Sequence, residues 1–421
     1  MLDIKFIREN PDKTREGLKK KGMDFDLDYL LSLDEKRRKK IQEVDEMRAR
    51  QNALSGEIAT ARKSDRDKNI AESKELKIKL GDVEFELKAI EEEFEELTGK
   101  FPNLPLDNVP VGAGERDNVA FREIGERPKF SFETKDHLEL GINLGIIDFE
   151  TGAKVSGSDF YYLKNAGVML ELALVQYALE FLSQKGFSPR ITPDLARSKF
   201  YLGTGYLPRG SEAQTYMIED SDLGLIATAE VTLAGIHADE ILDNKQLPIY
   251  YAGYSHCFRR ESGSYGKYSK GLYRVHQFTK VEMFVYCRPE DSPKIHEDLL
   301  GYEEKLWQGL GIPYRVVEMC AGDLGAQAAR KFDLEAWMPG RKDWGEVTST
   351  SNTTDYQARR LGIKYRDADG KIKFVHTLNG TAIAVSRAII AILENYQQED
   401  GSVEIPEVLQ KYMGGMKDIR L

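Results

Sequence analysis

The chain of 421 residues has few cysteines and no run of uncharged apolar residues as long as a membrane span needs. Cys257, Cys287 and Cys320 have no paired spacing, which excludes a disulfide scaffold and a cysteine-rich zinc site and favours a reducing compartment. No run reaches about 18 uncharged apolar residues, because Glu171 and Arg387 interrupt the two most apolar stretches. The sequence therefore predicts a soluble protein of the cytoplasm that does not bind a membrane.

Several common nucleotide and metal motifs are missing as well. The sequence contains no GxxxxGK[ST] phosphate loop, no GxGxxG after a strand and no HExxH, and GSYGKYS at 263–269 has the wrong spacing for a phosphate loop. None of the six histidines has a partner at metal-ligand spacing, so we expect no zinc. A net charge of −10 argues against indiscriminate nucleic-acid binding but leaves room for a local basic surface.

Residues 34–98 differ in composition from the rest of the chain. They hold no proline and only two glycines, and apolar residues at a 4-3 spacing form a heptad seam. The seam consists of Leu76, Leu80, Val83, Leu87, Ile90, Phe94 and Leu97. A weaker stripe precedes it and consists of Leu30, Leu33, Val44, Met47, Leu54, Ile58 and Ala61. The two stripes predict a helical hairpin with arms about 45 Å long and a turn at 64–69.

Charge is distributed unevenly along this hairpin. KRRKK at 36–40 and RKSDRDK at 62–68 are basic, whereas residues 82–96 hold eight acids against Lys88. Such runs are often the solvated faces of a coiled coil, and the alternative is that the basic stretches hold a polyanion.

The remaining chain has a different pattern. Residues 99–125 are rich in proline and glycine at their start and predict a linker. From 126 to 421, short strand-like runs alternate with helical patterns. The sequence therefore predicts an N-terminal domain (1–98), a linker (99–125) and a larger α+β domain (126–421).

The segment 258–284 carries the most chemical information. It begins and ends as a strand, and its cations are Arg259, Arg260, Lys267, Lys270 and Arg274. Alternation on a strand places Arg259 with Glu261 on one face, and likewise Phe278, Lys280, Glu282 and Phe284. Cations, carboxylates and an aromatic ring on one face could hold a phosphate and a flat base. The alternative is a ladder of cross-strand ion pairs.

Two later segments offer further candidates. WGEVTSTSNTTDYQARR (344–360) combines Glu346 with many hydroxyls, which suits Mg²⁺ and phosphate, although a Ser/Thr-rich loop is the common alternative. HTLNGTAIAVSRAIIAILENYQ (376–397) predicts a strand, an NG turn and an apolar helix. Arg387 in that helix needs an anion or an acidic partner such as Glu394.

Taken in order, these segments resemble the class II aminoacyl-tRNA synthetases and, closely, the seryl-tRNA synthetases. The matching segments are the hairpin, GTGYLP (203–208), TAEV (228–231), FRRESGSYG (258–266), HQFTKVEMF (276–284), SNTTDYQARR (351–360) and HTLNGTAIAVSR (376–387). Each motif alone is weak, but their order together with the hairpin is specific and covers nearly the whole chain.

The resemblance implies an α+β fold and an activity. The fold is an antiparallel sheet flanked by helices, with a long antiparallel α-helical coiled-coil arm, in a homodimer joined through a helix and strand ending near Pro193. The activity is ATP-dependent ligation of L-serine to tRNA(Ser) through a seryl-adenylate, with tRNA(Sec) as a further substrate where it exists. Mg²⁺ would accompany the ATP.

The resemblance also implies roles for individual residues. Arg259 and Arg387 would be catalytic, binding the α- and γ-phosphates of ATP. The implied ATP site consists of Arg259, Arg260, Glu261, Val275, Phe278, Glu346, Val347, Thr348, Ser349 and Arg387. The implied serine site consists of Thr228, Ala229, Glu230, Arg259, Glu282 and Thr381. Glu346 and Ser349 would bind the metal.

Some positions depart from the pattern usual in that family. Thr381 takes the place of Ser in the frequent motif NGS. Thr348 and Thr350 replace Ser and Cys in the usual motif EISSCSN, and Tyr206 replaces Gln in GTGQLP. Thr381 adds a methyl group and leaves the fine shape of the serine pocket open. Two alternative functions belong to other classes of protein. The first is a non-catalytic relative that binds RNA or a partner, and the second is a relative that aminoacylates a carrier protein, which the hairpin disfavours.

Overall fold

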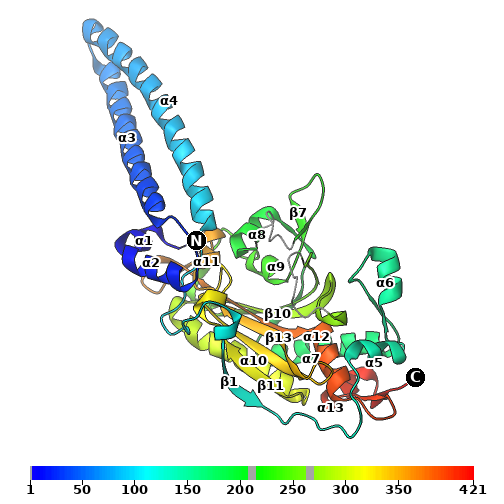
Figure 1. Cartoon of the computed structure of the whole chain (residues 1–421). Helices are drawn as coiled ribbons and strands as arrows, with labels where there is room; N and C mark the ends of the chain where they lie inside the picture. The colour runs from blue at the N-terminus through cyan, green and yellow to red at the C-terminus, as the bar shows by residue number, and fades with distance from the viewer. Residues whose placement is uncertain (1, 207–214, 262–269) are drawn as a thin grey trace. The chain divides into compact units, whose positions relative to one another are not determined.

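A computed structural model of the chain describes residues 2–206, 215–261 and 270–421 (Figure 1). The chain divides into two compact units. The first consists of residues 1–19 and 23–102, and the second of residues 20–22 and 103–421. The first unit is helical, and the second contains the sheets.

The first unit consists of two short helices and a long helical hairpin, which is blue to cyan in Figure 1. Its helices are α1 (Ile4–Glu9), α2 (Pro11–Lys20), α3 (Leu27–Thr60) and α4 (Lys63–Lys100). At 1.5 Å per residue, α3 and α4 are about 51 and 57 Å long. The predicted coiled-coil arm is therefore confirmed.

The two predicted stripes pack on each other. Val44 is buried against Leu80 and Val83, and Met47 and Leu87 pack on this cluster. The hairpin turn was predicted at 64–69, but it lies at residues 61 and 62, where the backbone is extended, and α4 already begins at Lys63. The polar run 64–69 belongs to α4 and not to the turn. Asp65 lies in the first turn of α4, where an acidic side chain stabilises the helix by interacting with the positive end of its dipole.

Cations of α3 contact side chains of α4 across the hairpin, in ion pairs and one cation–π contact. Arg37 lies over the ring of Phe94 at 4.9 Å from its centroid, and Lys40 lies 2.7 Å from a carboxylate oxygen of Glu86. Arg48 and Arg50 have partners on α4 in the same way, Glu84 and Glu72, each at 2.7 Å. Acidic residues of α4 thus neutralise several of the cations of α3.

The second unit is built on an eight-stranded sheet that is antiparallel except for one parallel pair at an edge. In order across the sheet, its strands are β1 (Val119–Ile124), β11 (Tyr314–Glu318), β12 (Arg330–Met338), β13 (Asp343–Asn352), β16 (His376–Ala384), β10 (Gln277–Cys287), β9 (Ile249–Phe258) and β4 (Ser188–Ile191). The long central strands are rich in Val, Thr, Phe and Tyr, which suits a sheet buried on both faces.

Smaller sheets and helices surround the large sheet. The short strands are β2 (Ile147–Asp148), β3 (Tyr162–Leu163), β5 (Leu195–Arg197), β6 (Tyr216–Met217), β7 (Leu223–Leu225), β8 (Ile241–Asp243), β14 (Lys364–Arg366), β15 (Ile372–Phe374), β17 (Val403–Glu404) and β18 (Asp418–Ile419). The helices are α5 (His137–Asn143), α6 (Phe149–Ser156), α7 (Ala166–Gln184), α8 (Ser198–Thr204), α9 (Glu230–Ala234), α10 (Ser292–Gly309), α11 (Tyr356–Arg360), α12 (Val385–Asn395) and α13 (Glu407–Gln410). The predicted α+β class is confirmed.

Alternation along the strands separates the main core from the other face of the sheet. On β10, Val281, Met283 and Val285 enter the main core with α7, α10 and α12. Phe284 and Tyr286 point to the opposite face and pack in a second cluster with α9 and α11. The second face also carries the cleft described below.

Helix α7 is, among the described residues, the one helix long and apolar enough to cross a membrane by composition. Leu170, Leu174 and Leu182 of α7 are fully buried in the main core, as expected of a core helix in a globular protein. Val168, Met169 and Leu172 of the same helix are exposed. This helix therefore has apolar side chains on two faces.

The segment predicted as a linker, 99–125, takes part in both units. Its first two residues end α4, and residues 119–124 form β1, the edge strand of the large sheet, which pairs with β11. Residues 103–125 belong to the second unit. The proline- and glycine-rich composition thus coincides with chain that forms neither α-helix nor strand between 101 and 118.

Lys21 is a buried lysine of the second unit. Its ammonium group donates to the backbone oxygens of Asn103, Ala328 and Ala326 at 2.8, 2.9 and 3.4 Å. The Asn103 side chain in turn donates to the backbone oxygen of Gln327 at 2.9 Å. Together these two residues hold the backbone of 326–328.

Candidate active site

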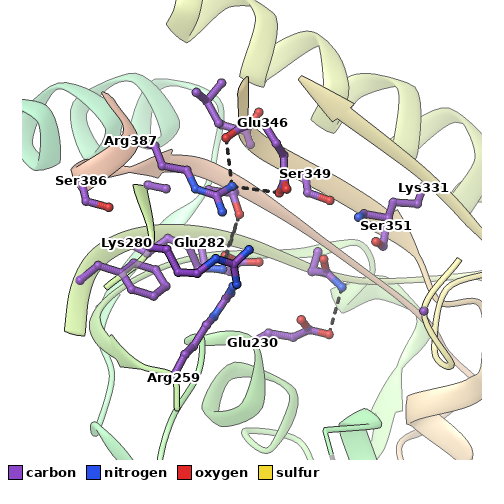
Figure 2. Close-up of a pocket in the computed structure, with 18 of the residues that line it drawn as sticks. Glu230, Arg259, Lys280, Glu282, Lys331, Glu346, Ser349, Ser351, Ser386 and Arg387 are labelled. Atoms are coloured by element: carbon purple, nitrogen blue, oxygen red, sulfur yellow. Dashed lines mark hydrogen bonds and ion pairs between the residues drawn. The ribbon is translucent and has the colours of Figure 1, made fainter. Parts of the chain in front are cut away.

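A cleft of about 340 Å³ opens on the second face of the large sheet, over β10, β16 and β13 (Figure 2). Among the described lining residues, five are cationic: Arg259, Arg274, Lys280, Lys331 and Arg387. Four are acidic: Glu230, Glu261, Glu282 and Glu346. The cleft therefore combines positive charge for an anion with carboxylates for a cation.

Three of the four carboxylates have a cationic partner. Glu261 pairs with Arg274, Glu282 pairs with Lys280, and an oxygen of Glu346 lies 3.1 Å from Arg387. Arg259 has no carboxylate partner within the described ranges; its guanidinium lies 5.1 Å from the centre of the Phe278 ring. Figure 2 shows Arg259 and Arg387 projecting into the same space. This arrangement leaves Arg259 available to an anionic ligand.

A β-bulge decides which side chains of β13 face the cleft. Leu334 of β12 is opposite Thr348 and the next residue is opposite Glu346, so Val347 is the extra residue. The hydroxyl of Thr348 consequently points away and donates to Glu303 of α10 at 2.9 Å. Glu346 and Ser349 therefore face the cleft together, as Figure 2 shows.

The charges around Glu346 keep its carboxylate ionised. Burial alone would raise the pKa of Glu346, but the positive charges of Arg387, Lys331 and Arg259 outweigh it and lower the pKa to about 2. Arg387 also donates to the backbone oxygen of Glu346 at 3.0 Å and lies over the ring of Tyr273. An ionised carboxylate beside a hydroxyl is a suitable donor pair for Mg²⁺.

The other end of the cleft is lined by polar side chains of β10, β16 and α9. The hydroxyl of Thr381 lies 3.4 Å from Glu282 and 3.5 Å from the ammonium group of Lys280. Glu230 accepts hydrogen bonds from Gln357 at 2.7 Å and Asn379 at 3.0 Å. This end can hold a small ligand that carries both hydrogen-bond donors and a charge.

Most of the predicted site residues meet at this cleft. Those that line it are Glu230, Arg259, Glu261, Val275, Phe278, Glu282, Glu346, Val347, Thr348, Ser349, Thr381 and Arg387. Thr228, Ala229 and Arg260, although described, are not lining residues. Thr228 and Ala229 are buried behind Glu230, and the Thr228 hydroxyl accepts from the Glu230 backbone N–H at 3.2 Å.

Two sequence predictions about the local structure of the site were wrong. Arg259 and Glu261 do not share a strand face, because β9 ends at Phe258 and Glu261 has a φ of 49°. Residues 379 and 380 form no turn but continue β16, and a Cβ at Gly380 would lie 2.9 Å from a carboxylate oxygen of Glu303. Two alternatives that the sequence left open are also decided. The acidic partner of Arg387 is Glu346, distant in sequence, and not Glu394. The Ser/Thr-rich segment begins as strand β13 and is not a loop.

Some predicted positions lie outside the described residues. They include Lys267, all of GSYG (263–266) and the last two residues of GTGYLP. Lys270, at the end of the same segment, pairs with Asp136 and is not a lining residue of the cleft.

The sequence analysis assigned no site role to several lining residues: Tyr206, Tyr273, Lys280, Gln327, Lys331 and Asn379. Lys280 and Asn379 lie on strand faces already singled out, so the alternation of β10 and the neighbourhood of Thr381 could have indicated them. Lys331 comes from β12, whose pairing with β13 the sequence does not reveal.

Comparison with known proteins identifies the family. Residues 1–105 match the model of the seryl-tRNA synthetase N-terminal domain, and residues 215–396 match that of the tRNA synthetase class II core domain (G, H, P, S and T).

No group of three or more His, Cys, Asp or Glu side chains that could hold a metal ion is found in the part of the chain that the structure describes.

Whole-chain relatives agree with both matches. The serine–tRNA ligase of Dictyoglomus turgidum is 54% identical over 417 residues, covering 98% of each chain. The crystal structure of seryl-tRNA synthetase from Pyrococcus horikoshii complexed with ATP is 45% identical with a TM-score of 0.92, covering 100% of this chain and 99% of that one. The cytoplasmic serine–tRNA ligase from Naegleria fowleri, solved with AMP, is 36% identical with a TM-score of 0.88, covering 100% of this chain and 99% of that one. The chain therefore belongs to the seryl-tRNA synthetases, the serine–tRNA ligases of class II.

Proposed function

We propose that the cleft joins L-serine to ATP as a seryl-adenylate and then transfers the seryl group to tRNA(Ser). The observation that carries this proposal is the convergence of Arg259 and Arg387 on one cleft, with Glu346 paired to Arg387 beside it. The serine carboxylate is already ionised at neutral pH, so its attack on the α-phosphorus needs no protein base. The protein supplies alignment and positive charge.

Arg259, which has no carboxylate partner among the described residues, binds the α-phosphate and the substrate carboxylate, and Arg387 binds the γ-phosphate. Phe278 stacks on adenine, and Glu261, Val275 and the other predicted ATP-site residues complete that site. Glu346 and Ser349 hold Mg²⁺, which neutralises phosphate charge when it is bound. Two protein ligands suit Mg²⁺, because it commonly takes its remaining ligands from water and phosphate.

The charges around Glu230 and Glu282 indicate which group of serine each carboxylate binds. Glu282 is neutralised by Lys280, whereas Glu230 has only neutral hydrogen-bond donors in direct contact. The ammonium group of serine therefore goes to Glu230. The hydroxyl of serine goes to the Glu282 and Thr381 side of the cleft, where alanine would leave polar groups unpaired.

The test is ATP–pyrophosphate exchange with serine, threonine, alanine and glycine. We expect exchange with serine to exceed that with alanine by roughly 10⁴, as for other sites that hydrogen-bond a substrate hydroxyl. Glu282→Gln should lose most serine-dependent exchange. It removes the negative charge that pairs with Lys280 and accepts the hydrogen bond from the serine hydroxyl. Wild-type exchange in that variant would refute the assigned role of Glu282.

The helical hairpin is the proposed tRNA-binding element. Its cations differ in availability: Arg48 and Arg50 have carboxylate partners, whereas the cations at the turn have no ion pair within the described ranges. These exposed turn cations are Arg62, Lys63, Arg66 and Lys68. Free cations on a rigid rod suit an RNA duplex, which is recognised mainly by its shape and backbone.

Deleting residues 36–95 tests this division of labour. We expect tRNA charging to be lost and serine-dependent pyrophosphate exchange to continue, because the cleft residues all lie in the second unit. Equal loss of both activities would contradict separate modules. Charging of tRNA(Sec) by the intact enzyme, in competition with tRNA(Ser), tests the second proposed substrate.

The proposed homodimer has an apolar surface available. Val168, Met169 and Leu172 are exposed on α7, and Ile191 at the end of β4 is 83% exposed. We infer that a second copy covers this surface, in the segment ending near Pro193. Light scattering should give twice the mass of the chain. Leu172→Glu should then yield monomers, and a monomeric wild-type enzyme would refute the proposal.

The cytoplasm is the proposed compartment. All three cysteines are buried and free, which is consistent with a reducing environment. Fluorescent tagging of the chain in its own cells, with a cytoplasmic marker as control, tests this location.

A further inference from the structure

Tyr206 has a contact that the proposed mechanism does not use. Its phenol donates to Oε2 of Glu230 at 3.0 Å, while Gln357 and Asn379 both donate to Oε1. Among the described residues, every direct partner of this carboxylate is thus a neutral donor. Tyr206 itself lines the cleft. Position 206 is also where the chain departs from the Gln that is usual in GTGQLP.

Hydrogen bonds matter at Glu230 because its surroundings disfavour charge. The residue is 2% exposed, and burial is the largest cause that raises its pKa, to about 7. The negative charge of Glu282 raises the pKa further. Lys280 and the hydrogen bonds from Gln357 and Tyr206 act in the opposite direction. Because the pKa of Glu230 is close to neutral pH, the fraction of the carboxyl group that is ionised depends strongly on each of its hydrogen-bond donors.

The rest of the neighbourhood offers no substitute for the phenol. The charged and titratable groups that face Glu230 and Tyr206 are Lys280, Glu282 and Arg259. Lys280 pairs with Glu282, and Arg259 lies over Phe278. Gln357 and Asn379 occupy the other oxygen. The Oε2 atom therefore has Tyr206 as its one direct donor among the described residues.

We propose that Tyr206 is a positioning residue of the amino-acid site, which holds the Glu230 carboxylate ionised and fixed so that it can receive the ammonium group of serine. This inference rests on the proposed function, in which Glu230 binds that group. Tyr206 acts through Glu230 and takes no part in the chemical step. It adds to substrate binding in the ground state and the transition state alike.

Tyr206→Phe tests the proposal with almost no change of shape. Losing one hydrogen bond to a charged group should raise the KM for serine in pyrophosphate exchange by about tenfold or more. The kcat should stay within about twofold, because uniform binding changes KM alone. The pH at which kcat/KM for serine reaches half its maximum should move upward by about one unit, since Glu230 then protonates more easily. The KM for ATP should not change.

Tyr201→Phe is the matched control. Tyr201 is fully buried and its phenol donates to the backbone oxygen of Gly224 at 2.6 Å, away from any carboxylate. This variant should lose stability without changing the KM for serine or the pH midpoint. Tyr206→Gln, which keeps a donor, should have a pH midpoint closer to the wild type than Tyr206→Phe has. If the Phe variant does not fold, the Gln variant is compared directly with the wild type, and a pH midpoint close to that of the wild type supports the proposal.

A Tyr206→Phe enzyme with the wild-type KM for serine and the wild-type pH midpoint would overturn the proposal. So would a Tyr206→Gln enzyme whose midpoint shifts as far as that of the Phe variant, because the donor would then be irrelevant. Failure of the proposed function looks different: the wild-type enzyme itself would show no serine-dependent exchange.

Discussion

Burial of Lys21 makes the stability of the second unit depend on pH. Burial lowers the pKa of Lys21 from 10.5 to about 7, so the unfolded chain binds more protons than the folded one between these values. Stability therefore rises with pH across this window. The two pKa values correspond to about 2.5 kcal/mol more stability at about pH 9 than at about pH 6 from this group.

Lys21→Met isolates this contribution, because methionine fills similar space without a charge. We expect the difference in unfolding free energy between wild type and variant to grow in favour of the wild type by about 2.5 kcal/mol from about pH 6 to about pH 9. Tryptophan fluorescence is the assay, since Trp307, Trp337 and Trp344 all lie in the second unit. Lys245→Met, at an exposed lysine, is the control and should show no such trend. A pH-independent difference for Lys21→Met would show that the three carbonyl oxygens keep the ammonium group charged, and would refute the reasoning.

Three further predictions follow from the described geometry. Changing the turn cations Arg62, Lys63, Arg66 and Lys68 to Gln should weaken tRNA charging. It should also reduce the slope of log K for tRNA binding against log salt concentration by up to about 3. Arg48→Gln with Arg50→Gln should change this slope less, and equal effects would refute a special role of the turn. Ser349→Ala should raise the Mg²⁺ concentration that half-saturates pyrophosphate exchange, but Thr348→Ala should not, because the bulge at Val347 turns Thr348 away. Gly380→Ala should cost about 1–3 kcal/mol of stability in a urea titration, because its Cβ would lie within 3.1 Å of three side-chain atoms; an unchanged midpoint would show that Glu303 and Met283 can move.

Periodic patterns were the best guide to this fold. The heptad seam of 76–97 repeats often enough to identify α4, and the alternation of β10 correctly put Phe278, Lys280 and Glu282 on the cleft side. Both features repeat regularly over many residues. The order of the motifs then indicated the family, which whole-chain similarity confirmed.

Single irregular residues limited the prediction of the site. The bulge at Val347 and the end of β9 at Phe258 each change which side chains share a face, and neither has a periodic signature. The NG pair looked like a turn because glycine is usually read as backbone freedom. At position 380 glycine instead allows close packing against Glu303 and Met283. Which strands are neighbours, and hence the place of Lys331, depends on contacts far apart in the chain.

The carbonyl groups held by Lys21 and Asn103 bear on how the enzyme can be shortened. A fragment that begins after the hairpin would contain Asn103 but not Lys21, and the backbone oxygen of Ala328, in the wall of the cleft, would lose its ammonium donor. The smallest self-sufficient catalytic piece is therefore discontinuous in sequence. It includes residues 20–22 from before the hairpin, so shortening the hairpin from its turn inward preserves the cleft better than cutting the chain from its N-terminus.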